Sequence, residues 1–567
     1  MPLELIPDTP DTAAAFQASK KKSSDGSDGQ ISTAKQLIEM AEKSCDLFHD
    51  ERGDGYAVTV HKEIRRTLKL RGRDFRRWLA GSYYASTGKA ANNEAISTAL
   101  GVLEAKASFD GRELELSNRF AWRDGVLFMD MADEAWRAIK IASSGWNVLD
   151  KPPVLFRRYN HQKALPVPAS GGKLSDIHKH LAVRHADDKL LVEAWLVACA
   201  FPHLPRPALT FHGPQGASKS TSARIMKAIT DPAVTDSVDL GKGPAELAQV
   251  LDHHAIPCFD NLTSIPVWAA DLLCRGVTGG AFSKRELYSD DSDILLTFKR
   301  AMIITGINIP THAPDLLDRL LLIELERIPT DRRMDEATFW AGFDSDAPRL
   351  FGALLDSLAG TLKHLPGIKL DRMPRMADFA RIACAYAVHA GIGADKMLDV
   401  IMRHTSRQTE EVLDSDPLAS AIRDFVLKRK TWTGTASQLL NQLNETTPTP
   451  KPDGWPKLAN SLSRKLNVLH ATLNEVGITI RRQKEGDRML TLESLADLSS
   501  VSSEPSEPSV YADSWPYDPR TIQTVEKSSS ASSSAPEPSV YAGSDDHDDK
   551  DDVSALFSGV AELESGL

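Results

Sequence analysis

The segment from Gly213 to Ser220 has the most chemically specific pattern, and it directly follows the short apolar run 208–211. It reads glycine, four residues, Ser218, Lys219 and then a hydroxyl side chain. In such a loop, backbone N–H groups surround a phosphate chain, the lysine neutralises it and the hydroxyl holds Mg²⁺. Ser218 stands where the usual pattern has glycine, so the loop by itself indicates a phosphate-binding site but does not establish one. The residues expected to surround ATP are Gly213, Pro214, Gln215, Gly216, Ala217, Ser218, Lys219, Ser220 and Thr221.

A second apolar run, 255–259, ends at Asp260. A carboxylate at the end of an apolar strand is typical of the group that helps to hold Mg²⁺ in a nucleotide site. Ser220 and Asp260 are therefore the predicted Mg²⁺ ligands. A second carboxylate usually follows and polarises the attacking water, but here the next residue is Asn261, which cannot accept a proton. We expect hydrolysis to be slow, or to use a base elsewhere in the chain.

Two further side chains complete the predicted catalytic set. Asn308 follows the apolar run 302–305, and a polar residue at the tip of the neighbouring strand can orient water against the γ-phosphate. Arg319 opens the next apolar run and suits an arginine presented to the nucleotide of a neighbouring subunit. An ATP site between subunits predicts a homo-oligomeric ring. The predicted catalytic residues are Lys219, Asp260, Asn261, Asn308 and Arg319.

The order of these motifs over residues 206–330 resembles that of superfamily 3 helicases, AAA+ ATPases that include primase-helicases of phages, poxviruses and mobile elements. The most specific part, 278–291 with 298–308, resembles the hairpin with which that family grips single-stranded DNA in the ring channel. The resemblance implies that Lys284 and Arg285 contact DNA phosphates. It implies that Lys299 or Arg300 supports them. A plain exposed basic loop is the alternative.

The resemblance implies an ATP-dependent DNA helicase or translocase that replicates a phage or mobile element as a ring, with a hexamer as the expected size. No primase domain is expected, because little chain precedes residue 50. Two alternatives remain open. One is a DNA-binding initiator or scaffold that uses ATP as an assembly switch, and the other is a DNA-sensing defence ATPase.

The elements that must position these residues follow from hydrophobic patterning. Between 206 and 326, short apolar runs alternate with helical patterns, which predicts a parallel α/β sheet. Helical patterns also occur at 33–48 and 92–109. The predicted fold class is multidomain α/β. Its parts are a disordered N-terminus 1–35, an α+β domain 36–167, an AAA+-like P-loop ATPase core 175–335, a helical segment 336–413, a winged-helix DNA-binding domain 414–495 and a disordered acidic tail 496–567.

The last folded segment predicts contact with duplex DNA. Residues 455–476 are the candidate recognition helix, with Arg464 and Lys465 facing outward, and Arg481 and Arg482 fall on the expected wing. A helix in the major groove with a basic wing on phosphates is a common docking mode. A winged helix used for protein contacts is the alternative.

Another basic cluster lies at 61–77, with Phe75, Trp78, Tyr83 and Tyr84 in or beside it. Basic side chains beside aromatic ones suit a nucleic-acid backbone with stacked bases. A solvated helix whose aromatic side chains belong to the core is the alternative.

Composition bounds the class of protein. The 567 residues are 41% hydrophobic and 26% charged, which is typical of a globular protein, and no apolar stretch is long enough to span a membrane. The net charge of −11 comes from residues 496–567, which hold 15 acidic and 3 basic side chains. Five scattered cysteines predict reduced thiols in the cytoplasm. The acidic tail is either a solubilising segment or a docking site for other replication proteins.

Overall fold

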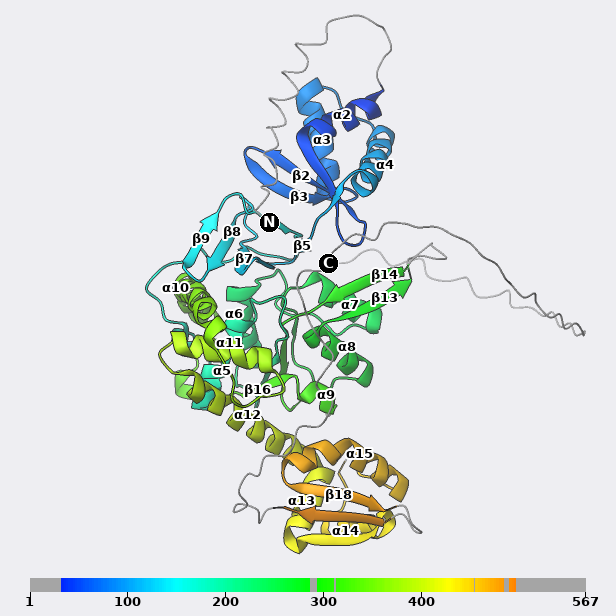
Figure 1. The fold of residues 1–567 in the computed structure, drawn as a ribbon, viewed down its shortest axis with the longest axis vertical. Helices are drawn as coiled ribbons and strands as arrows, with labels where there is room; N and C mark the ends of the chain where they lie inside the picture. Colours follow the sequence, from blue (N-terminus) through cyan, green and yellow to red (C-terminus); the bar gives the residue numbers. More distant parts are fainter. Residues whose placement is uncertain (1–31, 286–292, 310–312, 453, 484–488, 496–567) are drawn as a thin grey trace, which may run out of the picture. The chain divides into compact units, whose positions relative to one another are not determined.

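The computed structural model describes residues 32–285, 293–309, 313–452, 454–483 and 489–495 (Figure 1). The predicted tail 496–567 and nearly all of the predicted N-terminus 1–35 lie outside the described residues. Among the described residues, no helix is long and apolar enough to cross a membrane. The fold is mixed α/β with parallel strand pairs, which confirms the predicted class at that level.

The N-terminal part combines helices with sheets that contain both antiparallel and parallel strand pairs. Its first elements are α2 (Thr33–Ser44), β1 (Cys45–His49), β2 (Gly55–His61), β3 (Ile64–Lys69), α3 (Arg73–Thr87), α4 (Asn93–Phe109) and β4 (Arg112–Glu113), with sheet order β3-β2-β1-β4. The strands β5 (Leu116–Ser117), β6 (Phe120–Arg123), β7 (Val126–Asp130), β8 (Ala138–Ala142), β9 (Gly145–Leu149) and β10 (Leu155–Phe156) follow. The predicted helix 33–48 is too long, because its last residues form β1 and pair antiparallel with β2.

The basic cluster at 61–77 is divided between the β2–β3 hairpin and α3. The hairpin turns through Lys62 and Glu63, which have φ of 50° and 65°, as expected for a two-residue turn that matches the twist of its strands. Phe75 and Tyr83 are buried in the core of this part, whereas Tyr84 is 62% exposed. Most of the aromatic side chains in the cluster therefore serve packing.

A buried histidine gives this protein a predicted pH dependence. His254 is 8% exposed and stacks on His161 with 3.9 Å between ring centroids. Burial, reinforced by His161 and Lys227, lowers the pKa of His254 to about 3, against about 6.5 in an unfolded chain. Between these values the unfolded state binds a proton that the folded state does not bind, so stability falls as the pH drops below about 6.5.

The variant His254→Phe should reduce this pH dependence, because phenylalanine keeps a ring against His161 and does not titrate. Nδ1 of His254 makes no hydrogen bond in the structure, so the replacement sacrifices no bond at that atom. Between about pH 7 and about pH 5, the variant should lose about 1–2 kcal/mol less unfolding free energy than the wild type. Guanidinium chloride unfolding at both pH values measures this difference. Equal losses in the two proteins would show that His254 is protonated in the folded state.

The central part is built on a four-stranded parallel sheet with the order β12-β15-β11-β16. Its strands are β11 (Ala208–His212), β12 (Cys258–Phe259), β15 (Ile303–Gly306) and β16 (Leu320–Glu324). The helices between them are α6 (Lys219–Thr230), α7 (Pro244–His253), α8 (Val267–Thr278) and α9 (Pro314–Leu317). The alternation of apolar runs with helical patterns therefore identified a parallel sheet correctly. The predicted strand 255–259 shortens to β12 because Pro257 has no N–H to donate to a neighbouring strand.

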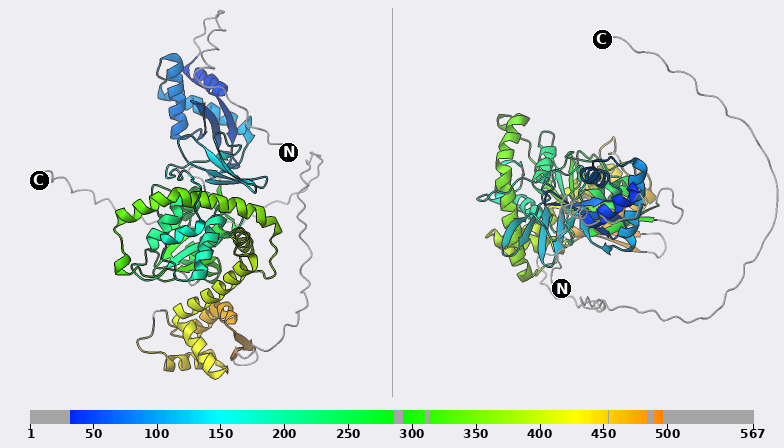
Figure 2. Two further views of the ribbon diagram at one scale, coloured as in Figure 1. Left: turned by 90° about the vertical axis from the view of Figure 1, so that its left-hand side faces the viewer. Right: turned by 90° about the horizontal axis from the view of Figure 1, so that it is seen from above.

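A layer of helices covers one side of this sheet (Figures 1 and 2). It consists of α5 (Ala186–Ala198), α10 (Glu336–His364), α11 (Ala377–His389) and α12 (Ala394–Ser415). α11 is rich in alanine and mostly buried, and it packs between α5 and α10. On another side, β13 (Gly280–Arg285) and β14 (Asp293–Phe298) form an antiparallel hairpin beside α7 and α8 (Figure 1).

The C-terminal unit contains α13 (Pro417–Arg429), β17 (Thr431–Thr435), α14 (Ala436–Thr446), α15 (Ala459–Glu475), β18 (Ile478–Gln483) and β19 (Met489–Ser494). The strands form an antiparallel sheet with the order β17-β19-β18. Three helices and the β18–β19 hairpin were predicted, whereas β17 was missed.

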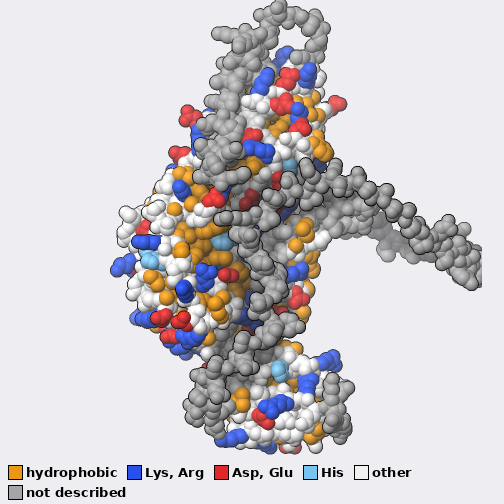
Figure 3. Space-filling model, viewed as in Figure 1, with side chains coloured by type: hydrophobic (Ala, Val, Ile, Leu, Met, Phe, Trp, Pro, Cys, Tyr) orange, Lys and Arg blue, Asp and Glu red, His pale blue; other side chains and the backbone are white. Residues whose placement is uncertain are grey.

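Acidic and basic side chains are interspersed over the face of the protein shown in Figure 3. This distribution agrees with the near-neutral net charge of residues 1–495.

Candidate nucleotide-binding site

The parallel sheet brings the predicted nucleotide residues to one edge. His212, the last residue of β11, pairs with Gly306 of β15. On the other side of β15, Ile304 pairs with Phe259 of β12. The carboxyl ends of these strands therefore lie side by side, and β15 separates the strand before Gly213 from the strand before Asp260. A ligand held by the loop after β11 would face the groups that follow β12 and β15.

The Gly213–Ser218 loop joins β11 to the first turn of α6. Gly213 has φ of 141°, and a Cβ there would lie 2.5 Å from the carbonyl oxygen of Leu325, so the loop can pass β16 only with glycine at this position. Gly216 has φ of 78°, in the left-handed region. The loop thus leads into the positive end of the twelve-residue helix α6, where free backbone N–H groups favour an anion.

Ser218 occupies the left-handed region, with φ of 55° and ψ of 36°. The conformation explains why the usual pattern has glycine here, because a side chain in this region costs about 1–2 kcal/mol. Glycine recovers this strain but loses about 0.5–1 kcal/mol through the greater freedom of the unfolded chain. At Ser218 the loop therefore has the left-handed backbone conformation that glycine usually adopts at this position.

The variant Ser218→Gly should therefore raise the free energy of unfolding by up to about 1 kcal/mol and should leave nucleotide affinity unchanged or improved. Ser218→Val should lose nucleotide binding, because a β-branched side chain is a poor fit to left-handed backbone. Denaturant unfolding and titration with a fluorescent ATP analogue measure both effects. Weaker binding by Ser218→Gly would instead show that the serine hydroxyl is itself a ligand.

Lys219 lies inside the curve of its own loop. Its Nζ donates to the carbonyl oxygens of Gly213 at 2.8 Å and Pro214 at 3.0 Å. Partial burial lowers the pKa of Lys219, and the nearby charge of Asp260 opposes that shift. The amine and the carboxylate therefore lie near enough to each other to interact electrostatically. Ser220, in the first turn of α6, is exposed beside them.

Asp260 and Asn261 are fixed by a residue that the sequence did not indicate. The hydroxyl of Thr305, on β15, donates to Oδ1 of Asp260 at 2.5 Å and accepts from the backbone N–H of Asn261 at 2.8 Å. Asn261 has a left-handed φ of 56° and an exposed side chain. Thr305 therefore sets the direction of the Asp260 carboxylate. A threonine in an apolar strand ordinarily indicates β propensity alone, so its sequence signal is weak.

Thr305→Val should act on turnover, because valine matches the shape of threonine and lacks the hydroxyl. We expect kcat for ATP hydrolysis to fall by about 10- to 100-fold, in line with a lost hydrogen bond to a charged group. The control Thr305→Ser keeps the hydroxyl and should retain most of the activity. Steady-state kinetics of both variants measure the contrast, and equal rates for the two would remove Thr305 from the site.

The two remaining predicted catalytic residues differ in position. Asn308 is exposed in the bend after β15, and the carbonyl of the preceding residue, Ile307, accepts from the N–H of Gly213 at 3.3 Å. Arg319 lies after α9, where its guanidinium donates to the carbonyl of Asp315 and stands 3.7 Å from the carboxylate of that residue. The predicted role of Arg319 stays a prediction, because it concerns a second subunit.

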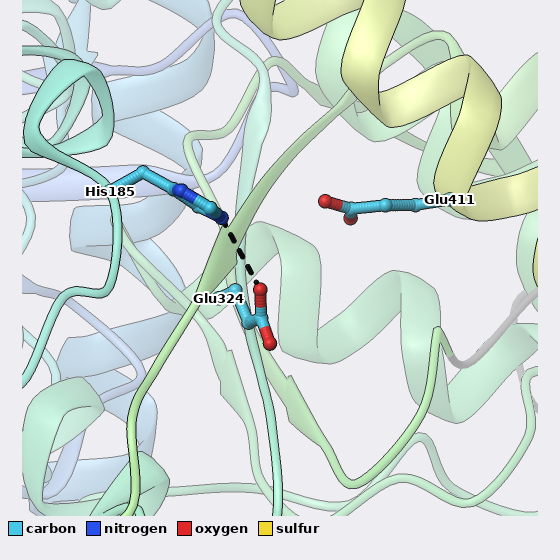
Figure 4. Close-up of side chains that lie close together, drawn as sticks. All are labelled: His185, Glu324 and Glu411. Carbon is cyan, nitrogen blue, oxygen red and sulfur yellow. Dashed lines mark hydrogen bonds and ion pairs between the residues drawn. The ribbon is translucent and has the colours of Figure 1, made fainter.

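Figure 4 shows a cluster of possible metal ligands formed by three side chains. His185 before α5, Glu324 at the end of β16 and Glu411 on α12 place one ligand atom each within 4.8 Å of one another. Imidazole and carboxylate are common ligands of divalent metals. The three residues are far apart in the sequence, and nothing in their spacing predicted the cluster.

Ion pairs account for this cluster without a metal. Arg184 pairs with Glu324, and Nε of Arg407 lies 3.5 Å from Glu411. Nε2 of His212, the residue before the loop, lies 3.6 Å from Glu411. Each carboxylate thus has a cationic partner, and the network joins α12 to the ends of β11 and β16.

The hairpin residues predicted to hold single-stranded DNA have different surroundings. Lys284 and Arg285 belong to β13 by their backbone, and their side chains lie outside what the structure describes. Lys299 is half-buried and donates to the carbonyl of His203 at 2.8 Å. Arg300 donates to the carbonyls of Leu251 at 2.7 Å and of two further residues. Burial lowers the pKa of Arg300. Arg300 therefore serves packing in this structure, because its donors already have backbone partners.

The predicted duplex-binding residues are also divided. Arg464 is exposed on α15. Lys465 is half-buried and lines a cavity of about 280 Å³ between α15, α12 and α9. Arg481 is exposed at 3.6 Å from the Glu493 carboxylate, and Arg482 donates to the carbonyl of Ser463 at 3.3 Å.

Two family models match the chain. That of the actinomycete integrative conjugative element replication protein matches residues 177–402, and that of the AICE RepA C-terminal domain matches residues 418–508. The chain carries the domains of a mobile-element replication protein. Its first matched domain spans the parallel sheet and most of the helical layer, and its second includes the described C-terminal unit.

Solved structures of the NrS-1 C-terminal region are distantly similar to this replication protein. An A-form apo structure has 12% identity and a TM-score of 0.38, covering 81% of this chain and 98% of that chain. A second has 13% identity and a TM-score of 0.36, covering 85% and 99%. No curated protein sequence matches the chain.

Proposed function

We propose that this replication protein is an ATP-dependent DNA helicase or translocase. The observation that carries the proposal is the convergence of Lys219 and Asp260 at one edge of the parallel sheet, with Thr305 holding the carboxylate. A lysine in a glycine-containing loop at a helix N-terminus, facing a carboxylate on a nearby strand, is the arrangement that ATPases use for phosphates and Mg²⁺. The strand order, with β15 between β11 and β12, supports the resemblance to AAA+ superfamily 3 helicases.

The residues present fit ATP and Mg²⁺. Gly213 lets the loop pass the carbonyl of Leu325, Gly216 has a left-handed φ, and α6 begins directly after the loop. Lys219 would bind the β- and γ-phosphates, and Ser220 and Asp260 would hold Mg²⁺. The bound ion would neutralise charge that develops on the phosphates.

DNA is the proposed partner. We propose that single-stranded DNA binds the β13–β14 hairpin and that duplex DNA binds the C-terminal unit. In this proposal the C-terminal unit acts as a winged helix, with β18–β19 as its wing. Arg464, Arg481 and Arg482 are its exposed cations among the predicted set. Arg319 would complete the site of a neighbouring subunit in a ring, for which a hexamer is the expected size.

A replication initiator or scaffold with ATP as a switch is the second candidate. Asn261 favours it, because an amide stands where a second carboxylate would polarise water. The match to replication proteins weighs against the third alternative, a defence ATPase.

ATP turnover by the full chain, with and without single-stranded DNA, tests the proposal. We expect Mg²⁺-dependent hydrolysis that DNA stimulates. Electron microscopy with a non-hydrolysable ATP analogue and forked DNA should show a closed ring around one strand. ATP binding without DNA-stimulated turnover would favour the initiator.

A further inference from the structure

The chain returns over the Gly213–Ser218 loop after it leaves β16. The backbone N–H of Ile328 donates to the carbonyl of Gly216 at 3.2 Å, which fixes this segment beside the part of the loop that a phosphate would contact. The segment continues through a short helical turn, Thr330–Arg332, before α10 begins. It carries Arg327, Arg332 and Arg333, all of them exposed.

Two of these arginines reach Gly216. A Cβ added to Gly216 would lie 3.5 Å from Nη2 of Arg333 and 3.8 Å from Nε of Arg327. The three atoms nearest to that position all belong to these two side chains. Both guanidinium groups therefore lie beside the loop, and both belong to the same subunit as the loop.

Neither arginine has an acidic partner among the residues that the structure describes. Nε of Arg333 donates to the carbonyl of Ile328 at 3.3 Å, which orients the side chain and leaves its terminal nitrogens available. Arg224 on α6 provides the contrast, because it pairs with the carboxylates of Asp236 and Glu336 at 2.8 Å each. Two guanidinium groups without an acidic partner among the described residues therefore lie at the loop that is predicted to hold phosphates.

We propose that Arg327 and Arg333 bind phosphate oxygens of the nucleotide held by the Gly213–Ser218 loop of the same subunit. The inference rests on the proposed function, since it assumes that this loop binds a nucleotide. The planar guanidinium fork matches two phosphate oxygens at once, and such charge-assisted bonds are stronger than neutral ones. The pair contributes from within the chain, whereas Arg319 is predicted to act on a neighbour.

Binding of mant-ATP with Mg²⁺ to the full chain tests this proposal. Arg327→Ala and Arg333→Ala should each weaken affinity by about tenfold or more, and the double variant should weaken it further. Arg332→Ala is the matched control, because Arg332 lies in the same segment and is not among the atoms nearest to Gly216; its affinity should equal that of the wild type. The alanine variants should also show a weaker dependence of affinity on salt.

Mant-adenosine separates phosphate binding from distortion of the loop. If the arginines contact phosphates, its weak binding should be the same in all variants, whereas an equal loss for mant-adenosine and mant-ATP would overturn the proposal. Arg333→Lys keeps the charge without the fork and should bind mant-ATP with intermediate affinity at unchanged thermal stability. Wild-type affinity in both alanine variants, together with loss of binding in Lys219→Ala, overturns the inference and leaves the proposed function intact. No binding by the wild type overturns both.

Discussion

Replacing Lys219 with alanine should abolish DNA-stimulated ATP turnover, with a fall in kcat/KM of about 100-fold or more. The amine is the cation at the centre of the loop, and its two hydrogen bonds go to carbonyls of the loop itself. Its removal should therefore take away the proposed phosphate contact and leave the packing of the fold almost unchanged. A coupled ATPase assay and a mant-ATP titration, each with single-stranded DNA present and absent, measure the loss.

Lys396→Ala is the control for this change, because Lys396 is an exposed lysine on α12, away from the loop. It should have wild-type turnover. Thermal unfolding of Lys219→Ala should match the wild type. Wild-type turnover in Lys219→Ala would show that the Gly213–Ser218 loop does not take part in ATP hydrolysis.

Replacing Asp260 with asparagine should separate binding from hydrolysis. The variant keeps an oxygen that can accept from the Thr305 hydroxyl, so the local structure should persist, but it loses the negative charge that would hold Mg²⁺. We expect turnover to fall by about 100- to 1000-fold, while mant-ATP affinity changes much less. Hydrolysis assays over a range of Mg²⁺ concentrations measure the effect.

Asp239→Asn is the matched control for the lost charge. Asp239 is exposed and makes no ion pair with another described residue, so its replacement should leave the rate unchanged. A rate for Asp260→Asn within a few-fold of wild type would mean that Asp260 has only a structural role. An equal loss in both variants would indicate a general effect of charge.

The strand ends were the predictable part of the site. Runs 208–211 and 320–324 became β11 and β16 almost residue for residue, because buried parallel strands need unbroken apolar sequence. Once these strands are parallel, the groups that follow them meet at one edge. The helical segment 336–413 also agrees with α10, α11 and α12.

Contacts between distant segments could not be predicted in the same way. Thr305 reads as an ordinary strand residue, and its role depends on β15 lying between β11 and β12. Arg300 reads as a free cation until the structure places it among the backbone carbonyls of Leu251 and Asp252. Arg327 and Arg333 acquire a role because the chain turns back over Gly216 after β16. In each case the deciding neighbour is remote in the sequence.

Strand displacement from a forked DNA duplex tests the central claim most directly. The full chain should open forks with ATP and Mg²⁺. It should open none with a non-hydrolysable analogue, and Lys219→Ala should open none with ATP. Failure of the wild type on forks of both polarities, while ATP binds and rings assemble on DNA, would contradict the account and favour an initiator that uses ATP as a switch.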